Sequence, residues 1–421
     1  MIRRIQALRY RCLRHVDVRL DRFQVAVGPN GSGKSAFFDV LGFLGDVVRE
    51  GLETAVTRRT ANLQDLVWSR PEEPLRFELA VETDIAGDMA SRLPEDAGFR
   101  TFRYELAVEE VDGSLRIADE RGLLIARSPQ PPREPPNLFP APLPSVPTIL
   151  QGGGRPGART ILSKSAEGRT GFYSETTPRS GQGWAVSISL APSRSALRNL
   201  PESAETFPVA THFRSLLDNG VQSLFLDSDA MRKASPPHLG RNGLRPDGSN
   251  LPWVVARLKR KDPDSFGEWL GHVRTALADI RDIEVTVKPD DRHAHLVLVY
   301  ETGVRVPSWT ASDGTLRFLA LTLLAYLPSS AVYLIEEPEN GLHPLALDTI
   351  YDAFWSAHES QILTATHSPA FLKLVQPKEA LCFAKDAAGA TDIVRGPEHP
   401  HLRDWQGKAD MEILFATGVI G

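Results

Sequence analysis

The sequence has few cysteines: Cys12 and Cys382 are the only two among 421 residues. They lie far apart, and neither has cysteine or histidine neighbours at metal-ligand spacing, so we expect neither a disulfide framework nor a zinc site. No run approaches the roughly 20 apolar residues of a membrane span, and the N-terminus lacks the apolar core of a signal peptide. These absences predict a cytoplasmic protein without a membrane partner.

Sustained heptads and internal repeats are absent as well. Between Ser35 and Ser312 no apolar heptad pattern persists, so long coiled-coil arms are not expected. The net charge of −5 argues against a surface that is basic throughout, but it leaves DNA possible as a partner through a local basic group. The candidates are Lys259-Arg260-Lys261 and the arginines near the N-terminus, and ordinary solvated faces also explain both.

Residues 28–35 form a complete G-x-x-x-x-G-K-S phosphate loop. Residues 23–27 before it are β-prone, and residues 36–48 after it carry apolar residues at helical spacing, which is the strand–turn–helix context that the motif requires. Lys34 is expected to reach the β- and γ-phosphates of a nucleoside triphosphate, and the Ser35 hydroxyl to hold Mg²⁺. The predicted nucleotide-binding residues of this loop are Gly28, Pro29, Asn30, Gly31, Ser32, Gly33, Lys34 and Ser35.

Two later strand ends carry candidate catalytic groups. Residues 332–335 are typical of a buried strand, and they end in Glu336 and Glu337, which is the form of a Walker B strand. Glu336 is predicted to orient Mg²⁺ or its water, although Asp is usual there, and Glu337 to polarise the attacking water. Residues 361–366 indicate another buried strand, after which His367 can approach the γ-phosphate. The predicted catalytic residues are therefore Glu337, His367 and Lys34, and the predicted metal ligands are Ser35 and Glu336.

A helix with a small, polar start lies between the phosphate loop and the acidic strand. Ser312 is predicted to cap the apolar helix at 316–324, and the segment Ser312-Asp313-Gly314 has the form of a phosphate-binding helix end. The acidic pair is followed by the turn Asn340-Gly341-Leu342-His343.

The order of these motifs along the chain resembles that of ABC-type ATPases. The wording Glu-Glu-Pro-Glu-Asn-Gly-Leu-His-Pro and Thr-His-Ser-Pro is similar to the soluble RecF/SMC/OLD-like group, often described as AAA-family ATPases. Here Ser-Asp-Gly stands where the family has Ser-Gly-Gly. The resemblance implies ATP and Mg²⁺ as cofactors and hydrolysis of ATP to ADP and phosphate.

The resemblance also implies an ATP-dependent homodimer. In this superfamily the signature serine of one subunit caps the γ-phosphate bound by the other, and the D-loop turn passes messages between the sites. The signature residues expected to act in trans are Ser312, Asp313 and Gly314. The expected D-loop residues are Asn340, Gly341, Leu342 and His343.

Four further residues are candidates for roles known in relatives. Arg11 matches a basic residue that helps to hold nucleotide phosphate in relatives. Tyr10 is a candidate for the aromatic residue that stacks on adenine. Gln64 and Gln151 are both candidates for the glutamine that links core and insert.

The resemblance implies a gating role for a DNA-related process or a partner effector, in the leading interpretation within bacterial anti-phage defence. The 54 residues after His367 (368–421) are too few for the metal-binding nuclease domain of OLD proteins, so a nuclease or toxin is expected on a separate chain. The alternatives are a RecF-like ATPase of DNA repair or recombination, and a slow-hydrolysing nucleotide sensor that partners a toxin. The motor subunit of a membrane transporter is a further, less favoured alternative.

The fold class predicted is α/β: a P-loop NTPase (ABC-type) core with an added antiparallel β layer and a helical or irregular insert. Alternating residues at 75–81, 101–108 and 114–117 predict the antiparallel layer. Residues 128–157 are Pro- then Gly-rich, which is typical of a linker and less so of a docking ligand. Residues 251–277 show helical periodicity, and 283–288 with 294–300 indicate a hairpin.

These patterns divide the chain into four parts. The N-terminal part of the core, with the phosphate loop and β layer, is 1–125, and the Pro/Gly-rich segment with further strands is 126–200. The helical lobe and hairpin are 201–300, and the C-terminal part of the core, with the signature, Walker B strand, D-loop and histidine, is 301–421.

Overall fold

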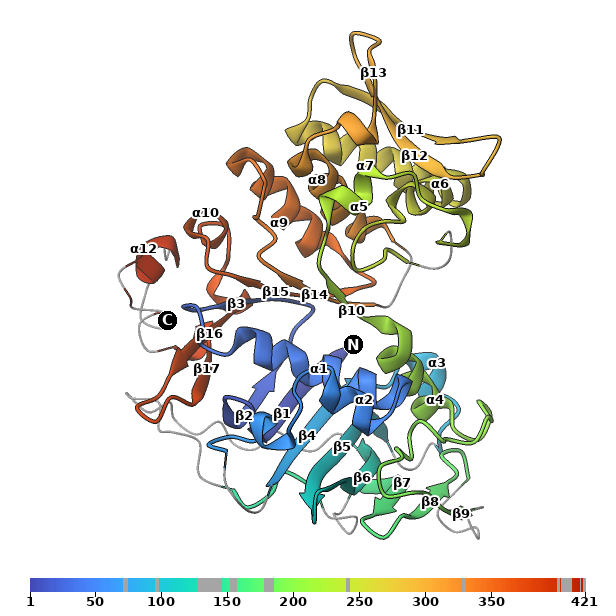
Figure 1. Cartoon of the computed structure of the whole chain (residues 1–421), viewed down its shortest axis with the longest axis vertical. Coiled ribbons are helices and arrows are strands. Elements are labelled where there is room, and N and C mark those ends of the chain that lie inside the picture. Colours follow the sequence, from blue (N-terminus) through green and yellow to red (C-terminus); the bar gives the residue numbers. More distant parts are fainter. Residues whose placement is uncertain are drawn as a thin grey trace.

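The computed structural model describes the chain except residues 71–74, 95–97, 127–145, 152–156, 178–184, 240–242, 328–330, 400–401, 403–410, 417 and 419–421. Sheets of eight, six and three strands, with helices packed against them, make up the described part (Figure 1). Most of the Pro- and Gly-rich segment 128–157 lies outside the described residues. None of the described helices is long and apolar enough to cross a membrane.

The six-stranded sheet has the order β10-β14-β15-β3-β16-β17, and every neighbouring pair except β16 and β17 is parallel. Its strands are β3 (Phe23–Val27), β10 (Val221–Leu224), β14 (Val332–Glu336), β15 (Gln361–Thr366), β16 (Ala380–Lys385) and β17 (Thr391–Arg395). Both β3 and β15 are buried at every residue, as expected for parallel strands that are covered on both faces. The three strands predicted around the motifs are thereby neighbours in one sheet.

Strand β10 was not predicted: the sequence analysis placed Val221–Leu224 in the helical lobe, but it forms the edge of the six-stranded sheet beside β14. It has four residues, too few for a periodic signal. Its place in the sheet depends on parallel pairing with a strand more than 100 residues later.

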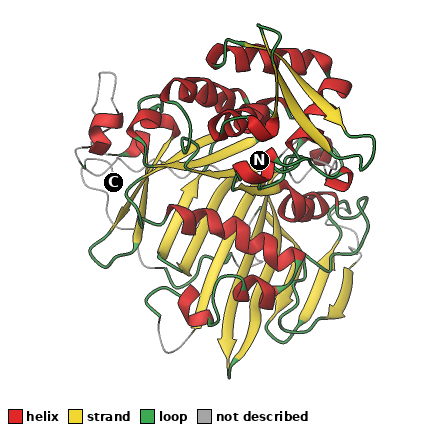
Figure 2. Ribbon diagram, turned by 45° about the horizontal axis from the view of Figure 1, so that its top comes forward, coloured by secondary structure: helices red, strands yellow, loops and turns green. Residues whose placement is uncertain are grey.

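Helix α1 (Lys34–Arg49) packs between the six-stranded and the eight-stranded sheet (Figure 2). One apolar cluster joins Phe37 and Leu44 of α1 to Leu334 and Leu363 of the six-stranded sheet and to Phe77 of the eight-stranded sheet. A second cluster covers the opposite face of the six-stranded sheet with the helices of the lobe. The helix that follows the phosphate loop is therefore held rigidly by both layers.

The eight-stranded sheet is antiparallel and has the order β2-β1-β4-β5-β6-β7-β8-β9. Its strands are β1 (Ile2–Tyr10), β2 (Leu13–Arg19), β4 (Leu75–Asp84), β5 (Phe99–Val111), β6 (Ser114–Ala126), β7 (Ala158–Ser165), β8 (Arg169–Tyr173) and β9 (Ala185–Ser189). The alternation seen at 75–81, 101–108 and 114–117 thus marks three neighbouring strands, and β6 continues well beyond the predicted segment.

A lobe of helices and a small sheet stands on the six-stranded sheet (Figure 1). Its helices are α5 (Ser228–Arg232), α6 (Leu251–Lys261), α7 (Pro263–Ala276), α8 (Asp313–Leu323) and α9 (Leu347–Ser356), and its sheet has the order β11-β12-β13 with strands Ile280–Val287, Ala294–Tyr300 and Arg305–Pro307. The predicted hairpin is present, and it belongs to this separate sheet. The helical stretch 251–277 is two helices, because Pro263 lacks the N–H that a continuous helix needs and Asp262 caps α7 by accepting from the Ser265 N–H at 3.0 Å.

The remaining α-helices of the described chain are shorter. They are α2 (Leu52–Thr57), α3 (Gly87–Ala90), α4 (Pro208–Ser215) with the π-helical turn Leu216–Gly220, α10 (Pro369–Leu372) and α12 (Met411–Ala416).

Candidate nucleotide-binding site

The phosphate loop connects β3 to α1 and is shaped by glycines in the left-handed region. Gly31 has φ +76° and Gly33 has φ +106°. A Cβ on Gly33 would lie 2.1 Å from Thr391 Oγ1 of β17, which donates to the Ser32 carbonyl oxygen at 2.9 Å. Thr391 therefore fastens the loop from a strand that is distant in sequence, and no motif pointed to it.

Lys34 closes the loop on itself. Its Nζ donates to the carbonyl oxygens of Gly28 at 2.6 Å and Pro29 at 2.9 Å. Burial lowers the pKa of Lys34, and the carboxylates of Glu336 and Glu337 oppose this shift. The ammonium group is thus held at the mouth of the loop, where a phosphate oxygen could replace the two carbonyl acceptors.

Ser35 and Glu336 meet at the start of α1. Ser35 Oγ donates to Glu336 Oε2 at 2.7 Å, across the gap between α1 and the end of β14. Among the described residues no group of three or more His, Cys, Asp or Glu could hold a metal ion. A hydroxyl and one carboxylate fit Mg²⁺ as it binds with a nucleotide, because Mg²⁺ takes one or two protein oxygens plus phosphate oxygens and water. Glu336, at a position where Asp is usual, therefore reaches Ser35, the other predicted metal ligand.

Glu337 lies at a backbone position that strains a non-glycine residue. Its φ is +50°, and its N–H donates to the Ala365 carbonyl oxygen of β15 at 2.8 Å. Glu337 Oε1 lies 3.2 Å from His367 Nδ1, and Oε2 accepts from Asn340 Nδ2. Strain of this kind persists where the surroundings hold it, and it often marks a functional position.

A third acid, Glu339, lies behind this pair and was not singled out from the sequence. Its Oε1 accepts from Thr366 Oγ1 at 2.6 Å, and its Oε2 has no hydrogen-bond partner among the described residues. Burial raises the pKa of Glu339, against the hydrogen bond from Thr366. It links the turn after β14 to the end of β15, next to His367.

Arg11 follows β1 with φ +53°, and its Nη1 donates to Asp39 Oδ2 of α1 at 2.8 Å. Tyr10 and Arg59 bond the same carboxylate: the Tyr10 hydroxyl donates to Asp39 Oδ2 at 2.7 Å and Arg59 Nε donates to Oδ1 at 2.8 Å. The prediction that Tyr10 stacks on adenine is wrong, because its ring has 0% exposure and packs against Phe43 and Phe77.

The pocket at the loop has a volume of about 780 Å³. Of the predicted residues it is lined by Arg11, Asn30, Gly31, Gly33, Lys34, Ser35, Glu336, Glu337 and His367. The loop after α2 adds Asp65, Trp68 and Arg70, which carry no recognisable motif; pairing of Tyr10 with Val67 brings this loop to the site. Neither Gln64 nor Gln151 lines the pocket.

The signature and D-loop residues contact each other and do not line this pocket, although Asn340 bonds its lining residue Glu337. Ser312 caps α8 by accepting from the Thr315 N–H at 3.1 Å, and Arg232 binds the Asp313 carboxylate. A Cβ on Gly314 would lie 2.6 Å from the Gly341 carbonyl oxygen, so the helix start packs directly on the D-loop turn. None of Ser312, Asp313, Gly314, Asn340, Gly341, Leu342 and His343 lines the pocket in the described part of the chain.

The fold and the arrangement of these motifs define a P-loop ATPase of the ABC type. The phosphate loop lies at the end of a central parallel strand, the acidic pair ends a strand two positions away in the sheet, and the histidine ends the strand between them.

Comparison with known proteins agrees with this class. Residues 163–373, half of the chain, match the family described as "AAA domain, putative AbiEii toxin, Type IV TA system", and the chain belongs to this family. The match contains the signature segment, the acidic strand and His367, while the phosphate loop precedes it. No curated protein matches the sequence.

Solved structures with a similar fold include heads of SMC proteins. One SMC head bound to the "C-winged helix domain of ScpA" has 15% identity and a TM-score of 0.49, covering 93% of this chain and 97% of that chain. One with an extended coiled coil, bound to a ScpA domain derived from Pyrococcus furiosus, has 13% identity and a TM-score of 0.48, with 93% and 95% covered. The SMC head domain from Thermotoga maritima has 12% identity and a TM-score of 0.38, with 94% and 98% covered. Similarity at this level carries no information about ligand or partner.

Proposed function

We propose that this protein binds ATP with Mg²⁺ at the phosphate loop and hydrolyses it to ADP and phosphate. The observation that carries the proposal is the convergence of Ser35, Glu336, Glu337 and His367 on one pocket beside Lys34. They come from three element ends, the start of α1, the end of β14 and the end of β15, and together they are the groups that phosphoryl transfer to water requires.

Different residues of the chain bind the phosphates, the metal ion and the attacking water. Lys34 binds the β- and γ-phosphates, and Ser35 with Glu336 would hold Mg²⁺, which supplies neutralising charge when bound. Glu337 orients and deprotonates the attacking water, and Asn340 and His367 hold its carboxylate in place. His367 is also within reach of the position that a γ-phosphate would take.

Two copies of the chain complete the site. Ser312 and Gly314 lie on an exposed helix start outside the pocket of their own chain, and Gly314 packs on the D-loop at Gly341. This supports a two-fold dimer in which the helix start of one copy faces the triphosphate of the other. Because the signature helix start packs on the D-loop turn, a displacement of one would affect the other, and the two ATP sites of the dimer would influence each other.

The test is the Glu337→Gln variant in Mg-ATP. We expect turnover to fall by about 10²–10⁴-fold while nucleotide binding is retained, and a dimer to accumulate in size-exclusion chromatography with light scattering. Adding Ser312→Arg should prevent the dimer without weakening nucleotide binding to the monomer. Lys373→Gln is the matched control, because Lys373 is an exposed residue at the end of α10 and its replacement should alter neither turnover nor dimerisation. A Glu337→Gln chain that stays monomeric in saturating Mg-ATP would refute the dimer, and full turnover would refute the role of Glu337.

The ATP cycle is proposed to gate a separate effector protein such as a nuclease or toxin, in anti-phage defence. The family description, which names a toxin and a toxin–antitoxin system, supports a toxin-related partner. Direct action on DNA is less well supported. In the basic group Lys259-Arg260-Lys261 at the end of α6, Lys259 already pairs with Asp282 at 3.1 Å and lies over the Phe266 ring.

Binding of duplex DNA to Glu337→Gln, with and without Mg-ATP across a salt titration, separates these two roles. Binding that needs ATP and weakens with salt would favour the DNA repair alternative. No binding in either state favours the partner effector. Single-turnover hydrolysis far slower than nucleotide exchange would favour the nucleotide-sensing alternative.

A further inference from the structure

The outer face of the eight-stranded sheet carries a line of buried ionic groups. The inner face, with Phe77, Leu79 and Tyr104, packs toward α1, whereas the alternate residues Glu78, Arg103 and Glu105 point the other way. The exposure of Glu78 is 3%, and that of Arg103 and Glu105 is 0%. Another part of the chain must therefore cover this face. It must also supply polar partners, because charged side chains are rarely so deeply buried without them.

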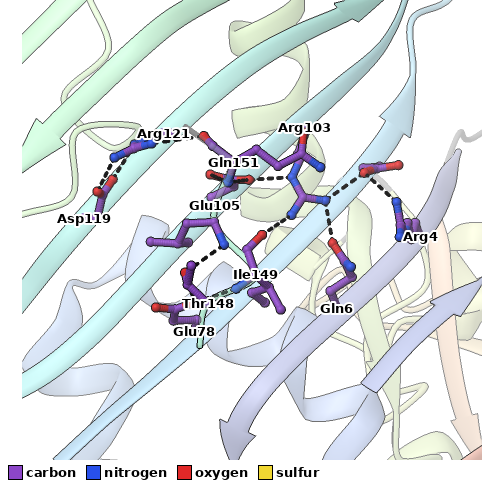
Figure 3. A network of polar contacts seen from close by, with 12 residues as sticks. Arg4, Gln6, Glu78, Arg103, Glu105, Asp119, Arg121, Thr148, Ile149 and Gln151 are labelled. Atoms are coloured by element: carbon purple, nitrogen blue, oxygen red, sulfur yellow. Dashed lines mark hydrogen bonds and ion pairs between the residues drawn. The ribbon is translucent and has the colours of Figure 1, made fainter. Parts of the chain in front are cut away.

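The cover is a short extended segment, residues 148–151 (Figure 3). Among the described strands, none forms ladder pairs with it; side chains hold its backbone instead. Glu78 Oε2 accepts from the Ile149 N–H at 2.9 Å, and the Glu105 carboxylate accepts from the Gln151 N–H at 2.9 and 3.1 Å. Arg103 Nη2 donates to the Ile149 carbonyl oxygen at 2.8 Å, and Arg121 Nη1 to that of Gln151 at 3.0 Å.

These contacts reproduce the pattern of a strand pairing. Residues 149 and 151 present both N–H and C=O to the sheet, which is the two-residue period of an extended chain. Two carboxylates take the two N–H groups and two guanidinium groups take the two carbonyls. The surface therefore recognises extended backbone, and it does so with charge-assisted hydrogen bonds.

Each recognising side chain is held in position by another charged group. Glu82 and Gln6 accept from Arg103 Nη1 at 2.7 and 2.6 Å, and Arg103 in turn bonds Glu105. The remaining pairs are Arg76 with Glu78 and Asp119 with Arg121. Because these pairs lie within the sheet and do not involve the segment, we expect the network to keep its shape without it, as a preformed binding site does.

Two side chains of the segment add contacts to this face in the described part of the chain. Ile149 is buried against Leu8 and Ala80, and Thr148 Oγ1 donates to Glu78 Oε2 at 2.7 Å. The requirement on a bound chain is thus an aliphatic residue preceded by a hydroxyl residue, with a free N–H two positions after the aliphatic one.

We propose that this face is a peptide-binding site, that residues 148–151 occupy it from within the chain, and that an extended segment of a partner protein with this pattern displaces them. Most of the contacts are to backbone, so a replacement chain recovers nearly all of them. During the exchange Arg103 and Glu105 remain paired with each other, and water can solvate the polar groups that the segment uncovers.

The test uses a fluorescent peptide of residues 145–152 and a full-length variant in which residues 148–151 are replaced by Gly-Ser-Gly-Ser. We expect the peptide to bind this variant at least about tenfold more tightly than the unaltered protein, where the internal segment competes. Proline at the position of Gln151 in the peptide removes the N–H that Glu105 accepts, and it should weaken binding about tenfold. Arg121→Gln in the same variant should have a similar effect.

Arg116→Gln is the matched control, because Arg116 lies on the same strand but pairs with Glu109 and does not touch the segment. A folded Gly-Ser variant that does not bind the peptide overturns the proposal, as does binding that ignores both the proline and Arg121→Gln.

Hydrogen exchange of the unaltered protein tests displacement even if the Gly-Ser variant does not fold. The amides of Ile149 and Gln151 should exchange at least about tenfold faster than ladder amides such as those of Leu79 and Leu106, because the segment opens locally. Exchange of all four at the rate of global unfolding would make the segment a fixed part of the core and overturn the proposal.

Discussion

The six-stranded and eight-stranded sheets use polar residues in opposite ways. In the six-stranded sheet a strand such as β14 is apolar up to its last residue, and the proposed functional groups Glu336, Glu337 and His367 lie at the strand ends or directly after them. In the eight-stranded sheet, charged residues such as Arg103 and Glu105 occupy the middle of a strand. The six-stranded sheet is covered by apolar clusters on both faces, so its charged groups lie at the strand ends. The antiparallel sheet packs one face on α1 and carries charged residues on the other.

The two sheets should also differ in how substitutions affect stability. Groups at the strand ends remain accessible to a ligand, and their loss should affect ATP turnover more than the free energy of unfolding. Groups on the face of the antiparallel sheet are buried with their partners, and their loss should affect folding more than chemistry. The predictions below test this division, ordered by the expected change in the free energy of unfolding.

Arg103→Gln should have the largest effect, lowering the free energy of unfolding by about 3–5 kcal/mol, because it leaves the buried Glu105 carboxylate without its cation. Urea unfolding followed by circular dichroism measures this. Arg116→Gln, which disrupts a half-exposed pair on the same face, should cost less than about 1 kcal/mol. Equal losses in the two variants would mean that burial does not set the strength of this network.

Glu175 should make the eight-stranded layer sensitive to pH. Burial raises the pKa of Glu175 to about 7, against hydrogen bonds from the Val209 and Ala210 N–H groups, whereas its ordinary value is 4.5. Because the folded chain binds this proton more tightly than the unfolded chain, the stabilisation is complete below pH 4.5 and is lost as the pH rises toward 7.

The expected loss over that window is on the order of 3 kcal/mol. Urea titrations at pH 5, 6 and 7 should show it as a difference between the unaltered chain and Glu175→Gln, in which the other ionisable groups cancel. Parallel pH profiles for the two chains would rule out this assignment.

Gly33→Ala should break the phosphate loop with a smaller effect on folding. The left-handed backbone and the clash with Thr391 Oγ1 should cost about 1–3 kcal/mol, and nucleotide binding should be lost because the loop can no longer adopt its shape. Calorimetric ATP titration and thermal melting measure the two effects. The control is Gly267→Ala in α7, which has open space around it and should raise stability by about 0.5–1 kcal/mol.

Ser312→Ala should have the smallest effect on folding, about 1 kcal/mol, through loss of the α8 cap. Ser312→Asp keeps a capping oxygen and should restore that stability, while its negative charge should still oppose the ATP-dependent dimer. Thermal melts and light scattering of both variants in the Glu337→Gln background separate the two roles. A Ser312→Asp chain that dimerises as well as Glu337→Gln alone would remove the serine from the interface.

Sequence alone was enough for the parts of the site that are local in the chain. The phosphate loop, the acidic pair and the strand-end histidine each combine a short motif with a regular strand or helix, and the structure has strands or helices where these predict them. The roles of Lys34, Glu337, His367 and Ser312 stay predictions. The prediction for Tyr10 was wrong because an aromatic residue beside a motif has the same appearance whether it faces a ligand or the core.

The sequence by itself determined the α/β class, the family resemblance and the residues of the phosphate loop, because these depend on neighbouring residues and on a repeating apolar pattern. Only the tertiary structure decided that β10 belongs to the core sheet, that Thr391 fastens the loop and that Gly314 packs on Gly341. It also decided that Arg103 and Glu105 bind residues 149 and 151. Such contacts join residues tens to hundreds of positions apart, and no local pattern specifies which distant partner will satisfy a buried charge, a carbonyl oxygen or a strand edge.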